Sequence, residues 1–342
     1  MGSQASPEAI GPTASKALVL IPGTINYFYN TTGRRVSEAL TGLGLRVAIR
    51  TLAEAEADAR RGEEPADLCM VMNVGEVLLG GGDRDAGIRR LRALGPFRLL
   101  ANVGLDSVRT HWFGDLSSWC ERAGVGTILD LGLVDQSDWV PPGIGVSYRF
   151  VPDGLTASEF RALEAAAGRG DDRPIPWSFV GHVTADRAGF VDHLVNAVDP
   201  SGFVYMPPLE PYTEAGSPHL NHDQFLAVLG KSRYHIWCSH HPYFYMEPER
   251  FRLSVLSGCV PIKALIDGQE PPDDAPLRPM MVPQEELSEA LRPGRDAWYR
   301  RLATDAYRRR SLSAAFAGAL ADLGIRCPSA RTPADRPWPL SA

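Results

Sequence analysis

The sequence is poor in cysteine and has no long apolar run. Its five cysteines stand far apart in a chain of 342 residues, at positions 69, 120, 238, 259 and 327. An odd and scattered set is unlike a disulfide framework, and a reducing compartment is its simplest setting. No apolar run approaches the roughly 20 residues that a membrane-spanning helix needs. We therefore expect a cytoplasmic protein with no integral membrane segment.

An excess of positive charge is also lacking. The formal net charge is −6, and lysine occurs only at positions 16, 231 and 263. A protein that binds along a nucleic acid needs a basic face, so we expect no nucleic-acid partner. Residues 1–16 lack the basic-then-apolar layout of a signal peptide, and we expect them to form a disordered leader.

Short apolar runs alternate with stretches of helical spacing. In the first half, the runs at 17–23, 46–52, 67–75 and 97–104 are each typical of a buried parallel strand. A segment rich in glycine, aspartate and proline at 168–176 interrupts the alternation, which restarts with an apolar run at 177–182. The pattern predicts an α/β fold with two tandem Rossmann-like domains that face a cleft.

The predicted domains occupy residues 17–168 and 169–325, followed by a tail at 326–342. Residues 296–324 have the pattern of a long helical stretch, which could pack on the second domain or cross to the first. In open parallel sheets, ligands bind outside the carboxyl ends of the strands. The loops at those ends are therefore the candidates for a functional site.

The stretch MEPERFRLSVLSGCVPIKA at 246–264 predicts a short helix that ends on a glycine and leads into a strand. Gly258 suits a left-handed stop after the helix. Arg250 lies near the helix N-terminus, where its two-pronged guanidinium could bind a phosphate. Alternatively, Arg250 pairs with Glu247 or Glu249 on a solvated face.

Two segments resemble known proteins. PWSFVGHVTADR at 176–187 and SRYHIWCSHHPYFYMEPERFRLSVLSGCVPI at 232–262 resemble the C-terminal half of GT-B glycosyltransferases. They look most like the bacterial spore-maturation-type group, with a distant similarity to exostosin-type transferases. The similarity runs in order over about residues 17–325. It implies a GT-B fold and a metal-independent enzyme that transfers a sugar from a nucleotide-activated donor.

The resemblance also implies donor-binding residues. In that family a strand ending in FVG opens the donor domain, a later basic residue approaches the donor phosphates, and a helix ending in SGC lines the nucleotide-sugar pocket. Gly181 matches the strand, Arg187 the basic residue, and Arg250 the helix. On this basis we assign donor binding to Gly181, His182, Arg187, His240, Tyr243, Glu249, Ser257 and Gly258.

The chain departs from the family at Leu253. This residue stands near the place where retaining GT-B enzymes carry a glutamate that holds the nucleotide ribose. The departure leaves open an altered donor, or a degenerate transferase that serves as a nucleotide- or sugar-binding partner protein. A sugar-nucleotide epimerase shares the architecture and is a further alternative.

Catalysis would require cations and a base. Glycosyl transfer leaves a diphosphate, whose developing charge Arg187 and Arg250 could stabilise. A base in the first domain would take the acceptor proton. Asp115 and His111 are the best-placed pair, and Asp106 is a further option. Alternatively, Asp115 caps a helix that starts near residue 116, and His111 is a surface residue.

The first strand is followed by Thr24, Asn26 and Tyr27, which suit an acceptor rich in hydroxyl groups. The same loop could instead pack its aromatic residues between the domains. The histidine-rich stretch at 235–241 lacks the spacing of zinc ligands, so we expect no metal and no cofactor beyond a nucleotide-sugar cosubstrate. The expected partners are a nucleotide sugar and a small-molecule, natural-product or glycan-precursor acceptor, and homodimer formation is left open.

Overall fold

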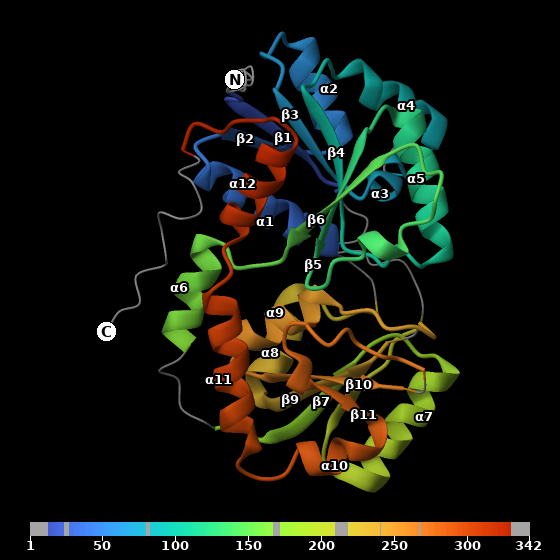
Figure 1. Cartoon of the computed structure of the whole chain (residues 1–342), viewed down its shortest axis with the longest axis vertical. Helices are drawn as coiled ribbons and strands as arrows, with labels where there is room; N and C mark the ends of the chain where they lie inside the picture. Colours follow the sequence, from blue (N-terminus) through green and yellow to red (C-terminus); the bar gives the residue numbers. More distant parts are fainter. Residues whose placement is uncertain are drawn as a thin grey trace, which may run out of the picture.

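Two α/β domains lie one above the other along the longest axis of the molecule (Figure 1). The structure is a computed structural model that describes residues 13–23, 27–79, 83–166, 172–208, 218–239, 241–266 and 268–329. Each domain is built on a parallel sheet, which confirms the predicted fold class. Within the described residues, no helix is both long enough and apolar enough to span a membrane.

The first domain has a six-stranded sheet in the order β2-β1-β3-β4-β5-β6. Its strands are β1 Lys16–Leu20, β2 Arg46–Arg50, β3 Leu68–Met72, β4 Leu99–Gly104, β5 Thr127–Gly132 and β6 Ser147–Pro152. Its helices are α1 Tyr27–Gly42, α2 Leu52–Arg60, α3 Val74–Leu79, α4 Arg84–Ala93 and α5 His111–Ala123. Helices cover both faces, so strands such as β3 are buried throughout and appear as continuous apolar runs.

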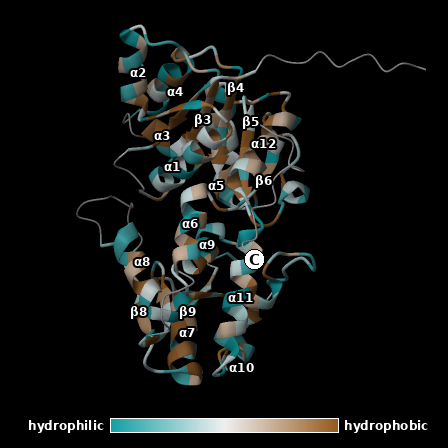
Figure 2. Cartoon of the chain, turned by 90° about the vertical axis from the view of Figure 1, so that its left-hand side faces the viewer, coloured by the Kyte–Doolittle hydropathy of each residue, from teal (hydrophilic) through white to brown (hydrophobic). Residues whose placement is uncertain are grey.

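Side-chain alternation divides the first-domain core into two layers. Val19 packs with α1 on one face of the sheet, while its neighbour Leu20 packs on the other face with Phe113 of α5. In Figure 2 the central strands are coloured as hydrophobic, and hydrophilic residues are visible on α2 at the periphery. The strands of this half therefore appear in the sequence as continuous apolar runs because the sheet is buried on both faces.

The second domain has a five-stranded sheet in the order β11-β10-β9-β7-β8. Its strands are β7 Ile175–Val180, β8 Phe203–Tyr205, β9 Ser232–Cys238, β10 Val260–Leu265 and β11 Met281–Pro283. Its helices are α7 Ala185–His193, α8 His222–Lys231, α9 Pro248–Leu256, α10 Leu287–Ala290 and α11 Arg295–Arg308. The connecting helix α6, Ala157–Ala166, contacts both α1 and α9 and so lies between the domains.

The C-terminal helical stretch crosses back to the first domain. It breaks after α11, and Ser311 caps a separate helix, α12, spanning Leu312–Asp322. Figure 1 shows α12 beside α1, far from α10. Phe316 and Leu320 are fully buried in the same core layer as Val36 of α1. The predicted boundary at 325 assigned these residues to the second domain, whereas their apolar face completes the core of the first.

Both predicted terminal segments also contribute to the first domain where the structure describes them. Thr13, predicted as leader, forms a parallel bridge with Arg326. Cys327, predicted as tail, is buried in the first-domain core. Residues 1–12 of the predicted leader and residues 330–342 of the predicted tail lie outside the described residues.

A buried cluster of charges joins the domains. Arg252 of α9 is about 1% exposed and forms ion pairs with Glu249 of its own helix and Glu159 of α6. Arg35 of α1 pairs with the same Glu159 at 2.8 Å and with Asp153 at 2.9 Å. Burial by itself raises the pKa of Glu159, but the guanidiniums of Arg252 and Arg35 outweigh it and lower that pKa to about 2. The cluster therefore fixes α9 against α1 and α6 through ionised groups.

Replacement of Phe316 by alanine tests the crossing of α12. The change leaves a cavity in the first-domain core and should cost about 3–5 kcal/mol in the free energy of unfolding, measured with urea. Trp298→Ala is the matched control, because Trp298 is an aromatic residue of α11 that is 46% exposed. Equal losses in the two variants would contradict the packing of α12 into this core.

Replacement of Arg252 by glutamine tests the interdomain cluster. It leaves buried carboxylates without their main cation and should cost about 3–5 kcal/mol in unfolding free energy near neutral pH. Because the folded pKa of Glu159 is lowered, its stabilisation is present above the ordinary carboxyl pKa and is lost as the pH falls toward about 2. The difference between wild type and variant should therefore shrink in acid. Arg233→Gln changes an exposed arginine of β9 and should be nearly neutral.

Candidate active site between the domains

A cleft of about 330 Å³ opens between the two sheets. Its first-domain wall consists of Phe28, Tyr29, Thr31, Leu105, Asp106 and Trp112. Its second-domain wall includes the ends of β7 and β8, the start of α8 and the first turns of α9. The size is that of a small-molecule site, and the position at strand ends is the one expected for open parallel sheets.

Two arginines lie on the second-domain wall. Arg250, in the first turn of α9, donates a hydrogen bond from Nη1 to the carbonyl oxygen of Val180 at 2.7 Å. Arg187, in the first turn of α7, is buried and donates from Nη1 to the carbonyl oxygen of His182 at 3.2 Å. Both therefore stand at the carboxyl end of β7, where they give this wall a positive charge.

The carboxylates near Arg250 have other main partners. Glu247 accepts hydrogen bonds from Lys263 Nζ at 2.7 Å and from Trp237 Nε1 at 3.0 Å, and Glu249 pairs with Arg252. Burial raises the pKa of Glu247, but Lys263 outweighs it and lowers the pKa to about 2. The predicted alternative, with Arg250 paired to these residues on a solvated face, is therefore wrong, because Arg250 lines the cleft.

Imidazole and aromatic rings surround the arginines. His182 packs edge-on against His219 with ring centroids 5.0 Å apart. Burial, followed by the neighbouring His219, lowers the pKa of His182 to about 4, so this ring is neutral at pH 7. His241 stacks on Tyr243 at 5.0 Å and approaches Trp112 of the first domain at 5.7 Å. The second-domain wall therefore combines the two arginines with imidazole and aromatic rings, and Glu247, Glu249 and Leu253 also line it.

A single half-buried acid, Asp106, lies on the opposite wall. Asp106 follows β4 and accepts a hydrogen bond from Tyr29 Oη at 3.0 Å. Tyr29 Oη in turn accepts one from Asn73 Nδ2 at 2.7 Å. Burial raises the pKa of Asp106, and the hydrogen bond from Tyr29 offsets part of that rise. Asp106 was the further option for a base, and it is the acid that the first domain brings to the cleft.

The structure does not bring the preferred predicted pair, Asp115 and His111, into the cleft. Helix α5 begins at His111, so Asp115 lies within the helix and cannot be its N-cap. Both residues are exposed, because the buried face of α5 is formed by residues such as Phe113 and Leu116. Trp112, which the sequence analysis did not select, lines the cleft in their place.

The SGC turn at 257–259 ends helix α9 and does not belong to the cleft. Gly258 has φ +67°, which confirms the predicted left-handed stop. A Cβ at Gly258 would lie 2.5 Å from Arg173 Nη2, and that guanidinium donates to the carbonyl oxygen of Ser257 at 2.9 Å. Neither Ser257 nor Gly258 lines the cleft. The motif ends α9 at the opposite end from Arg250.

The other predicted site residues divide into three groups. Those that line the cleft are Gly181, His182, Arg187, Glu249 and Arg250. Tyr243 stands beside it, between His241 and the guanidinium of Arg109, which is 4.4 Å from its ring centroid. Thr24, Asn26, His240 and the side chain of Tyr27 lie outside the described residues.

The sequence analysis missed several lining residues, namely Tyr29, Trp112, His219, His222 and Phe225. His222 and Phe225 belong to the first turns of α8, whose capping box at Asn221 and Gln224 was a readable helix start. Among the described residues, no three histidine, cysteine, aspartate or glutamate side chains are grouped as metal ligands. The metal-free site stays a prediction.

Comparison with known proteins supports the architecture. No family model matches the sequence. No curated protein sequence matches it either. Among solved structures, an α-glucosyltransferase in complex with UDP-glucose and DNA containing an abasic site has a TM-score of 0.57 at 10% identity, over 92% of this chain and 100% of that one. An α-glucosyltransferase in complex with UDP and a 13-mer DNA containing a HMU base has a TM-score of 0.55 at 10% identity, over 91% and 99% of the two chains.

Such low identity establishes the fold rather than the activity. A spinosyn forosaminyltransferase matches over 92% of this chain and 100% of that one at 10% identity, and its TM-score of 0.41 is too low to carry an argument. The finer resemblance to spore-maturation-type and exostosin-type transferases stays a prediction. The chain has an α/β fold of two parallel-sheet domains in the GT-B arrangement.

Proposed function

We propose that this protein is a glycosyltransferase that moves a sugar from a nucleotide-activated donor to a hydroxyl group of an acceptor. One observation carries the proposal: a single cleft places Arg187 and Arg250 on one domain and the half-buried carboxylate of Asp106 on the other. Cations suit a diphosphate, and an acid with a raised pKa suits a proton acceptor. The GT-B arrangement of the two domains supports the same function.

The second domain would bind the donor. The guanidiniums of Arg187 and Arg250 face the charge that develops on the departing diphosphate, and this electrostatic role needs no metal ion. The neutral rings of His182 and Phe225 offer flat surfaces for a base or a sugar. Donor binding would thus rest on side chains of α7, α8 and α9.

Ribose recognition would differ from that of the resembled enzymes. Leu253 lines the cleft, so an apolar side chain stands near the expected glutamate position. Glu249 lies four residues earlier and therefore on the same helix face. Arg252 holds its carboxylate at the edge of the cleft. We propose that Glu249 takes over the contact with the ribose hydroxyls.

The first domain would bind and activate the acceptor. The acceptor oxygen attacks the anomeric carbon, the bond from that carbon to the phosphate oxygen breaks, and the nucleoside diphosphate leaves with the bonding electrons. The acceptor proton passes to the carboxylate of Asp106. Phe28, Leu105 and Trp112 give this wall an apolar surface that would exclude water.

The acceptor would be a small molecule, a natural product or a glycan precursor. The net charge of −6 favours these over a nucleic acid. Two structures with this fold were solved with DNA, so an acceptor screen should include DNA as well as glycans and small alcohols. A cytoplasmic location and a monomeric or dimeric state complete the prediction.

The donor site is tested by a thermal-shift panel with UDP, GDP, dTDP, CMP and their sugars. One nucleotide should raise the melting temperature, and Arg250→Ala should weaken its binding about 10- to 100-fold, since a charged hydrogen bond contributes about 1.5–3 kcal/mol. Arg89→Ala removes an arginine of α4 that is 72% exposed and should leave the affinity unchanged. The absence of any shift with the wild-type protein would overturn the proposal.

The base is tested by Asp106→Asn. Release of nucleoside diphosphate from the bound nucleotide sugar should fall about 10²- to 10⁴-fold, while nucleotide affinity stays within about two-fold. In the wild type the rate should rise with pH through a midpoint above the ordinary aspartate pKa, because burial raises the pKa of Asp106 and the ionised form is the base. Asp115→Asn is the matched control. A loss confined to that control would restore Asp115 as the base.

A further inference from the structure

The short segment that carries Asp106 is held by an amide from another loop. We refer to residues 105–108 as the Asp106 loop. Gln136 is 4% exposed, and its Oε1 accepts a hydrogen bond from the backbone N–H of Val108 at 3.2 Å. Its Nε2 donates to the carbonyl oxygen of Asp106 at 3.4 Å. One side-chain amide therefore satisfies both a donor and an acceptor of this loop.

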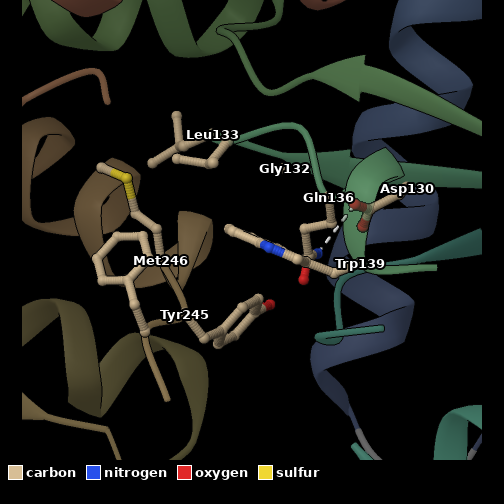
Figure 3. A pocket seen from close by; sticks show the side chains of 9 residues that line it. Asp130, Gly132, Leu133, Gln136, Trp139, Tyr245 and Met246 are labelled. Carbon is tan, nitrogen blue, oxygen red and sulfur yellow. Dashed lines mark hydrogen bonds between the residues drawn. The ribbon is translucent and has the colours of Figure 1, made fainter. Parts of the chain in front are cut away.

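Asp130 strengthens the preference for this amide orientation. Its Oδ2 accepts a hydrogen bond from Gln136 Nε2 at 3.0 Å, drawn as a dashed line in Figure 3. A carboxylate only accepts hydrogen bonds, so it selects the NH₂ end of the amide. The flipped amide would place Oε1 against Asp130 Oδ2 and against the carbonyl oxygen of Asp106, and NH₂ against the N–H of Val108, which are three repulsive contacts. Asp130 thereby directs Oε1 toward the Asp106 loop.

Tyr148 completes the arrangement from β6. Its Oη donates to Asp130 Oδ2 and accepts from the backbone N–H of Gln136 at 3.3 Å. The same hydroxyl therefore fixes both the carboxylate and the backbone that carries the amide. Asp130 is 3% exposed, so these hydrogen bonds form away from water, where they are strong.

We propose that Asp130 and Gln136 are positioning residues that hold the carboxylate of Asp106 in place for acceptor deprotonation. Neither residue lines the interdomain cleft, so neither touches the substrates. The inference rests on the proposed function for its catalytic part. It adds residues that act on the base through the backbone of the Asp106 loop.

The second domain holds the same loop from the other side. Tyr245 donates a hydrogen bond from its Oη to the carbonyl oxygen of Leu105. Figure 3 shows Tyr245 and Met246 on the second-domain side of a small crevice, opposite Gln136, Trp139 and Asp130. The position of the base therefore depends on groups from both domains. A change in the domain arrangement would alter the hold on Asp106 through Tyr245.

Protonation of Asp130 should loosen this arrangement. Burial raises the pKa of Asp130, the hydrogen bonds from Tyr148 and Gln136 lower it, and the nearby carboxylates of Asp106 and Asp135 raise it, with a result of about 7. From the second domain, the facing group is the phenol of Tyr245. Above this pKa the carboxylate accepts both hydrogen bonds, whereas below it one oxygen carries a proton and orients the amide less strictly.

The first test needs no ligand. Gln136→Glu keeps the size of the side chain but removes the donor to Asp130, and Asp130→Asn removes the ionised acceptor that favours this amide orientation. Amide hydrogen exchange in the peptide containing residues 105–109 should become about ten-fold faster in both variants, while β10 keeps its protection. Tyr148→Phe, a milder change, should give a smaller increase. Gln284→Glu, in the second domain, should change nothing. Unaltered exchange in folded variants would overturn the proposal.

The second test separates positioning from simple stability. With UDP-glucose as the probe, Gln136→Glu should lower kcat for nucleoside diphosphate release about ten-fold at nearly unchanged KM, and should move the midpoint of the pH–rate profile. Loss of melting temperature without a change in kcat or in that midpoint would refute the positioning role. A wild-type protein that binds no nucleotide would instead refute the proposed function, while the exchange measurement would still decide whether the amide holds the loop.

Discussion

The relative placement of the two domains depends on a buried arginine. Arg252 is taken out of water among the carboxylates of Asp153, Glu159 and Glu249, which belong to different parts of the chain. Removal of a charge from water is costly, and only good geometry with several partners compensates for it. The charged groups are therefore satisfied only when α9 lies correctly against α1 and α6. The cleft exists because that arrangement aligns α9 with the opposite wall.

Because of this constraint, one face of α9 points into the interdomain charge cluster and the other lines the cleft. Arg252 points into the interdomain cluster, while Arg250, two residues earlier, lines the cleft. Two residues correspond to about 200° of helix rotation, so these arginines must point in nearly opposite directions. One guanidinium holds the domains together, and the other remains available to a ligand. Glu249 belongs to both regions, since it pairs with Arg252 and also lines the cleft.

On the first-domain wall, too, the group that faces the cleft differs from the groups that hold the structure in place. Asp106 faces the cleft. The loop that carries it accepts hydrogen bonds from Gln136 of the first domain and from Tyr245 of the second domain. The carboxylate and its supports therefore come from separate segments. This arrangement suits the proposed role of Asp106, in which a half-buried carboxylate must keep one position.

Local sequence determined the architecture. A parallel strand buried on both faces is a continuous apolar run, so β3 was recognisable without any tertiary information. The left-handed turn at Gly258 was equally local, because a residue without a Cβ adopts that conformation readily. The resemblance of the 176–187 and 232–262 segments predicted that Arg187 and Arg250 bind the donor, and both line the interdomain cleft.

Tertiary packing decided the rest. The choice between Asp106 and Asp115 depended on where α5 begins, because a start at His111 rather than near 116 turns Asp115 to solvent and Trp112 to the cleft. The crossing of α12 depended on which core its apolar face completes, and the sequence pattern of an amphipathic helix does not specify its partner. Local pattern thus fixes which residues form strands and helices, whereas long-range packing selects which side chains meet across the cleft.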